Sequence, residues 1–131
     1  MKGMAIVLLG IRKDLARVFE GMLSEARGKG FPRVEVYLVD EVLGSVRAID
    51  TLRECLLSNI VTGINIFTAS DLPEAERLLS EIIRGAAMGR FDEALVVVGE
   101  SPSELHEMFL ERLKMIFGDK LLVRGIDYYA L

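Results

Sequence analysis

Two adjacent cations, Arg12 and Lys13, give this chain its clearest chemical signal. They follow Gly10 at the end of an apolar run, and no Ser, Thr, Asp or Asn stands before Asp14 to cap the helix expected to begin there. Cations at the amino end of a helix destabilise it by roughly a few tenths of a kcal/mol each unless an anion neutralises them. Together with the free N–H groups of the first helical turn, they predict a phosphate or carboxylate site.

Further polar residues follow the other apolar segments, and in a parallel sheet they lie at the carboxyl edge, where ligands bind. They are Asp40 and Glu41, then Thr68, Ser70 and Asp71, then Gly99, Glu100 and Ser101, and last Arg124. The predicted ligand-binding set is Gly10, Arg12, Lys13, Asp40, Gly99, Glu100 and Ser101. In this set the two cations supply charge, and Asp40 or Glu100 discriminates between ligands. The alternative is that a nearby carboxylate (Asp14, Asp40 or Glu100) neutralises both cations, or that they point into water.

His106, the only histidine, is a weak candidate for a catalytic residue. It stands at the margin of an apolar helical stripe, near Glu100, Glu104 and Glu107. The sequence leaves three roles open for it: a general base, a metal ligand, or a structural residue at the helix edge. One histidine among carboxylates without repeated spacing is poor evidence for a metal, so no metal site is predicted. Cys55 falls in a setting too apolar to stabilise a thiolate, and we interpret it as a core residue.

No motif in the sequence names a reaction. Asp40 stands at the end of a strand, where an acid would bind ribose hydroxyls, but the glycines of a dinucleotide fingerprint are missing after Gly10. A Walker-type phosphate loop is also absent. Where a phosphoacceptor receiver would need paired acids, this chain has Leu9 and Gly10. No cofactor is therefore predicted.

The elements that would position these residues alternate between strand and helix. Short apolar or β-branched runs predict strands at 4–9, 34–40, 64–68, 94–98 and 121–123. Between them, apolar residues at helical spacing predict a first helix ending near Gly28, a second over 46–61, a third starting at Ser70 or Asp71, and a fourth. We expect Ser101 to cap that fourth helix, with Pro102 in its first position and Glu104 completing a capping box.

Five mostly parallel strands and four helices joined by short turns predict one domain over 1–131, a three-layer, doubly wound α/β sandwich of the Rossmann-like or flavodoxin-like kind. Residues 94–98, the most apolar run, are expected to form a central strand. The tail at 126–131 is too apolar to float free, and we expect it to add a short strand or to dock on a neighbour.

Composition narrows the class of protein. The net charge of −4, without a basic block, makes nucleic acid an improbable partner. No apolar run reaches the ~20 residues that cross a bilayer, so no membrane association is expected. A single cysteine favours a reducing, cytoplasmic setting. The absence of Gln and the presence of only Asn59 and Asn65 give a thermophile-like composition. The apolar content of 51% exceeds what one sheet needs, which favours a homo-oligomer, most simply a homodimer.

Three functions fit these observations. The first is a regulatory module that binds a small anion or a nucleotide at the carboxyl edge and acts as a homo-oligomer. The second is an enzyme, a small hydrolase or transferase on a phosphorylated substrate; the lack of a readable nucleophile–base pair weighs against it. The third is a structural subunit without a ligand, assembled through apolar residues of 55–67 and of the Tyr128–Tyr129 tail.

Overall fold

A computed structural model describes residues 3–31, 33–40, 46–58 and 64–130 of the chain. Its strands are β1 (Gly3–Leu9), β2 (Arg33–Val39), β3 (Ile64–Ala69), β4 (Glu93–Val98) and β5 (Leu121–Gly125). Its helices are α1 (Leu15–Gly28), α2 (Val46–Ser58), α3 (Leu72–Ala87), α4 (Glu104–Phe117), the 3₁₀ turn η1 (Gly118–Lys120) and α5 (Asp127–Ala130). The strands form one parallel sheet with the order β3-β2-β1-β4-β5. The predicted doubly wound α/β sandwich is confirmed.

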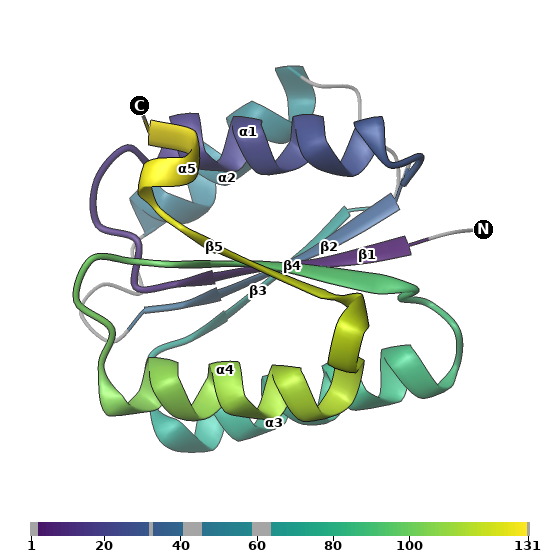
Figure 1. Ribbon diagram of the computed structural model, residues 1–131. Helices are drawn as coiled ribbons and strands as arrows, with labels where there is room; N and C mark the ends of the chain where they lie inside the picture. The colour runs from purple at the N-terminus through teal and green to yellow at the C-terminus, as the bar shows by residue number, and fades with distance from the viewer. Residues whose placement is uncertain (1–2, 32, 41–45, 59–63, 131) are drawn as a thin grey trace.

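The sheet lies between two helical layers (Figure 1). Helices α1, α2 and α5 cover one face, and α3 and α4 cover the other. Along β1, alternate side chains enter the two cores: Ile6 and Leu8 pack with the first layer, and Val7 and Leu9 with the second. A strand covered on both faces has no solvent side, which explains its unbroken apolar run.

The middle of the sheet is β1, with two strands on either side of it. The prediction that residues 94–98 would be central was therefore only approximate, because β4 lies one place from the middle and one from the edge. Both strands are internal, and both are almost entirely buried. Apolar content separates internal strands from edge strands, but it does not rank the internal ones.

The end of the chain forms structure beyond the four predicted helices. After β5, the one-turn helix α5 docks on α1, where the Tyr129 hydroxyl donates a 2.7 Å hydrogen bond to Glu25. A side chain at Gly21 of α1 would overlap the Tyr129 ring, so glycine here makes room for the docked tail. The tail therefore docks on a neighbouring element of the same chain instead of adding a strand. For the second helix, predicted residues 59–61 lie outside the described residues.

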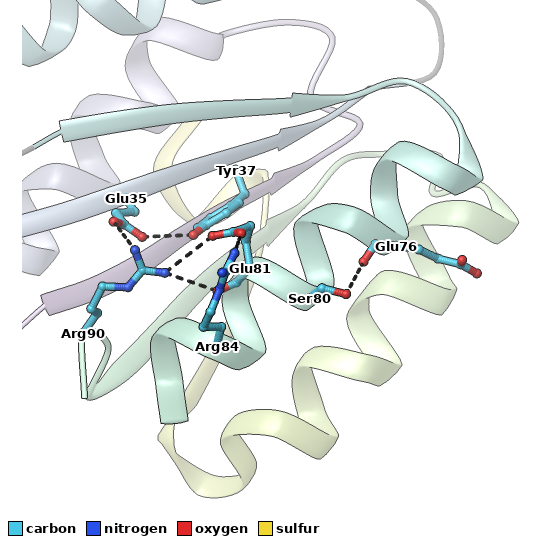
Figure 2. A network of polar contacts seen from close by, with 7 residues as sticks. All are labelled: Glu35, Tyr37, Glu76, Ser80, Glu81, Arg84 and Arg90. Atoms are coloured by element: carbon cyan, nitrogen blue, oxygen red, sulfur yellow. Dashed lines mark hydrogen bonds and ion pairs between the residues drawn. The ribbon is translucent and has the colours of Figure 1, made fainter. Parts of the chain in front are cut away.

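A polar network lies near the amino ends of the strands, on the face of the sheet that α3 and α4 cover (Figure 2). Arg90, just before β4, pairs with Glu35 of β2 at 3.5 Å and with Glu81 of α3 at 3.8 Å. The Tyr37 hydroxyl donates a 3.0 Å hydrogen bond to Glu35, and its ring stacks on Phe67. Burial is the main cause that raises the pKa of Tyr37, and the nearby Glu35 carboxylate raises it further. This network joins β2, α3 and the loop before β4 far from the carboxyl edge.

Candidate site at the carboxyl edge

The strand order reverses between β1 and β4. From β1 the chain builds outward through β2 to β3, and then crosses over to build β4 and β5 on the other side. The loops that leave β1 and β4 therefore diverge above two adjacent strands, which is where open α/β sheets bind ligands. Two groups of predicted site residues, at 10–13 and at 99–101, lie on these two loops.

Two glycines let the loops approach closely at this point. The Gly99 N–H donates a 2.9 Å hydrogen bond to the Leu9 carbonyl, and the Gly10 N–H donates one of 3.0 Å to Val39. A Cβ at Gly99 would overlap the carbonyl oxygen of Gly10. Gly10 itself has a φ of 66°, and a side chain there would overlap the imidazole of His106. At Gly99 the base of the site is therefore backbone packed on backbone, and at Gly10 the His106 imidazole fills the space that a side chain would need, so both positions favour glycine.

The two predicted cations each face a carboxylate. Lys13 Nζ lies 2.7 Å from Glu100 of the β4 loop, and the Arg12 guanidinium lies 4.0 Å from Asp40 at the end of β2. The hydrogen bond to Glu100 and its charge raise the pKa of Lys13. Lys13 and Glu100 are 63% and 53% exposed, whereas Asp40 is 10% exposed. The neutralisation that the sequence left open thus takes place, through Asp40 and Glu100.

Two hollows meet at these cations. The smaller, of about 110 Å³, is lined by Gly10, Arg12, Lys13, Glu100, Ser101 and Ile126. The larger is an open cleft of about 630 Å³ that Arg12 and Lys13 share with Asp40, the start of α1 and the first turns of α2. From α2 it receives Arg47 and Thr51, which sequence analysis did not single out. The start of α2 lies at the same edge as every other helix start, and that signal could have identified Arg47.

The helix that begins at this site lacks a side-chain cap. Asp14 occupies the cap position of α1 with a left-handed φ of 56°, and its side chain makes no capping hydrogen bond. By contrast, Asp71 caps α3 by accepting a 2.9 Å hydrogen bond from the Glu74 N–H, as predicted. Helix α4 is also capped by a side chain. Among these three helices, α1 alone presents its first turn without a side-chain acceptor.

The cap of α4 is Ser103, so the prediction of Ser101 was wrong. The Ser103 hydroxyl accepts a 3.3 Å hydrogen bond from the His106 N–H, and His106 Nδ1 accepts one of 3.1 Å from the Ser103 N–H. Histidine thus takes the place of the acidic residue in the capping box, and the helix begins at Glu104 rather than Pro102. Ser101, released from capping, lines the small hollow. His106 is 1% exposed and packs under Gly10, so the structure places it as a support of the loop.

The remaining candidates lie apart from the two hollows. Ser70 donates a hydrogen bond to Glu74 at the start of α3, and Arg124 pairs with Glu25 of α1 at 3.1 Å. Cys55 is buried against α1, and burial raises the pKa of its thiol, which agrees with a core role. Glu41 lies outside the described residues, so its pairing with another acid is not addressed.

Within the described part of the chain, no three His, Cys, Asp or Glu side chains gather closely enough to hold a metal ion. Each described helix is also too short or too polar to span a bilayer.

No protein-family model and no curated protein matches the sequence. The fold is similar to the crystal structure of a hypothetical protein from Sulfolobus tokodaii, with a TM-score of 0.69, 15% identity, and coverage of 95% of this chain and 96% of that one. Two structures of a universal stress protein from Archaeoglobus fulgidus, one in complex with dAMP, match at TM-scores of 0.46 and 0.45 and 14% identity. They cover 94% of this chain and 97% and 98% of theirs. The first likeness establishes a shared fold, and the TM-scores of the other two are too low to support more.

Proposed function

We propose that this chain is a binding module for a small anion, such as a nucleotide or another phosphate ester, which it holds at the carboxyl edge between β1 and β4. The observation that carries the proposal is the meeting of Lys13 with the β4 loop at the point where strand order reverses. Of the seven predicted ligand-binding residues, five line the small hollow there. The proposed role is regulatory, because the described residues that line the two hollows show no nucleophile hydrogen-bonded to a base.

The ion pairs at the site support exchange with an incoming anion. An ion pair between half-exposed side chains contributes about 0–1 kcal/mol, since water solvates both charges well. A phosphate group that accepts hydrogen bonds from Lys13 would therefore displace Glu100 at small cost. Arg12, which is 50% exposed and 4.0 Å from Asp40, is also within reach of both hollows.

The two hollows differ in a way that fits a phosphate ester. The small one has a lining that suits a phosphate group: the Arg12 and Lys13 cations and the Ser101 hydroxyl, with the Glu100 carboxylate beside them. The adjoining cleft is several times larger and offers Asp40 and Thr51 as hydrogen-bonding partners beside Leu15 and Ala48. A ligand with its phosphate in the first and its organic part in the second would satisfy both.

A thermal-shift panel of inorganic phosphate, nucleoside phosphates and carboxylates tests the proposal. A ligand at 100 times its Kd adds about 2.7 kcal/mol of stability, a rise of roughly 7–10 °C in a domain of this size. Arg12→Ala/Lys13→Ala should abolish the shift. Arg27→Ala/Lys29→Ala, which removes the same charge at the far end of α1, should retain it.

Glu100→Gln provides a sharper second variant. It removes the carboxylate that competes for Lys13 and should tighten anion binding by about threefold to tenfold, since it also removes like charge from the hollow. If no compound shifts the wild type, or if the double variant at Arg12 and Lys13 responds as the wild type does, the proposal is wrong. Where no compound shifts the wild type, the remaining function is that of an assembly subunit.

A further inference from the structure

An apolar groove runs between α3 and α4 on the outer side of the molecule. It has a volume of about 510 Å³ and is lined by Ile83, Ala86 and Ala87 of α3 and by Arg112, Met115 and Ile116 of α4, above Leu79. Ile83 is 49% exposed and Met115 is 81% exposed. Leu72, which is 51% exposed, lies seven residues before Leu79 and eleven before Ile83. These spacings place the three side chains on one side of α3, so the apolar strip follows the helix along its length.

We propose that this surface, the α3/α4 groove, is where a second copy of the chain docks to form a homodimer. Large apolar side chains exposed at this level cost free energy in water unless a partner covers them. In the dimer, the exposed Met115 side chain of each copy would enter the groove of the other.

Charge complementarity identifies the partner as a second copy. In the amino halves of the two helices acidic residues outnumber basic ones: Glu74, Glu76, Glu104 and Glu107 are acidic and Arg77 is basic. In the carboxyl halves basic residues are in excess: Arg84, Arg112 and Lys114 are basic, and Glu81 and Glu111 are acidic. Both helices therefore run from an acidic end to a more basic end. When two such surfaces pack antiparallel about a two-fold axis, each acidic end meets a basic end, which is the self-complementarity that an isologous interface requires.

Arg112 provides the most specific contact of the proposed interface. It lines the groove beside Met115. Arg84 and Lys114 each pair with a glutamate of their own helix, whereas Arg112 forms no such ion pair within the described part of the chain. A guanidinium beside an apolar groove is well suited to a carboxylate on a partner, because its planar fork binds both oxygens. The acidic amino half of a second copy supplies such carboxylates.

The surface supplies a large part of a stable interface and leaves the ligand site accessible. Helices of 16 and 14 residues extend about 24 and 21 Å, and side by side they are about 20 Å wide, so together they present a face of roughly 450 Å² towards the roughly 800 Å² per partner of a standard interface. The groove lies at the carboxyl halves of α3 and α4, towards the amino edge of the sheet. It is thus distant from Gly10 and Lys13, and the dimer does not depend on the proposed anion site.

Sedimentation velocity on the full chain between about 1 and 100 μM tests the proposal. The wild type should sediment as a dimer, and Met115→Glu should raise the dimer Kd at least tenfold by placing a charged group in the apolar groove. Leu57→Glu is the matched control, since Leu57 of α2 is 80% exposed on the opposite helical layer, and it should leave the dimer unchanged. Ile83→Asp is a second disrupting variant within the groove.

Charge reversal tests the antiparallel pairing directly. Arg112→Glu and the double variant Glu104→Arg/Glu107→Arg should each dimerise more weakly than the wild type, and an equal mixture should recover association. A monomeric wild type at 100 μM would overturn the proposal, and so would a dimer that survives Met115→Glu and Ile83→Asp with the far-ultraviolet circular dichroism unchanged. A dimer dispersed by Leu57→Glu instead would place the interface on α2 and overturn it as well.

Discussion

The substitution Gly99→Ala tests whether backbone packing between the β1 and β4 loops holds the site together. The added methyl group would overlap the Gly10 carbonyl oxygen and lie 3.2 Å from the Leu9 carbonyl oxygen. Backbone atoms cannot rotate away as a side chain can, so the two loops must separate. The separation costs about 1–3 kcal/mol of overpacking and weakens the Gly99–Leu9 hydrogen bond, a further ~1 kcal/mol.

The expected loss of unfolding free energy is therefore about 2–4 kcal/mol, measurable by urea unfolding and as a fall of roughly 7–14 °C in Tm. Gly28→Ala is the matched control, because nothing lies within 4 Å of its added Cβ at the end of α1. That change should leave stability the same or raise it by up to about 1 kcal/mol. A Gly99→Ala variant as stable as the wild type would refute the close approach of the two loops.

Two further changes test the cap of α4 and the buried tyrosines. Ser103→Ala should lower unfolding free energy by about 1 kcal/mol because it removes the α4 cap, whereas Ser101→Ala should be neutral; urea unfolding distinguishes the two. Burial raises the pKa of Tyr37 and of Tyr129, so both phenols keep their protons longer in the folded state than in the unfolded one. Their contribution to stability is therefore complete below about pH 10 and is lost as pH rises above it. Tyr37→Phe should flatten that alkaline decline, and an unchanged decline would show that Tyr37 is not protected.

The sequence predicts the elements of this fold well because each local signal agrees with the tertiary structure. The β1 segment is apolar without interruption because it is covered on both faces. Asp71 precedes Glu74 by three residues at the start of α3, and the expected cap forms. The residues at the carboxyl edge follow from the same logic, since every strand of a parallel sheet ends there.

What the sequence does not predict depends on contacts between distant segments. Whether Lys13 meets Glu100 is decided by β1 and β4 being neighbours, and strand order leaves no local trace. The choice of Ser103 over Ser101 depends on His106 reaching back to the Ser103 N–H, whereas the usual capping box calls for Glu or Gln in that position. The docked tail likewise depends on Glu25 and on the space above Gly21, a hundred residues earlier.

The most direct test of the anion site is a ¹H–¹⁵N NMR titration of the full chain with inorganic phosphate and then with AMP. The account predicts that amide shifts concentrate at residues 10–15 and 99–103, on the two loops above β1 and β4, and that AMP adds shifts near Asp40 and Thr51. Amides at the far end of α1, around Lys29, should not move. Shifts confined to other parts of the molecule, or none at millimolar ligand, would contradict an anion site at this edge.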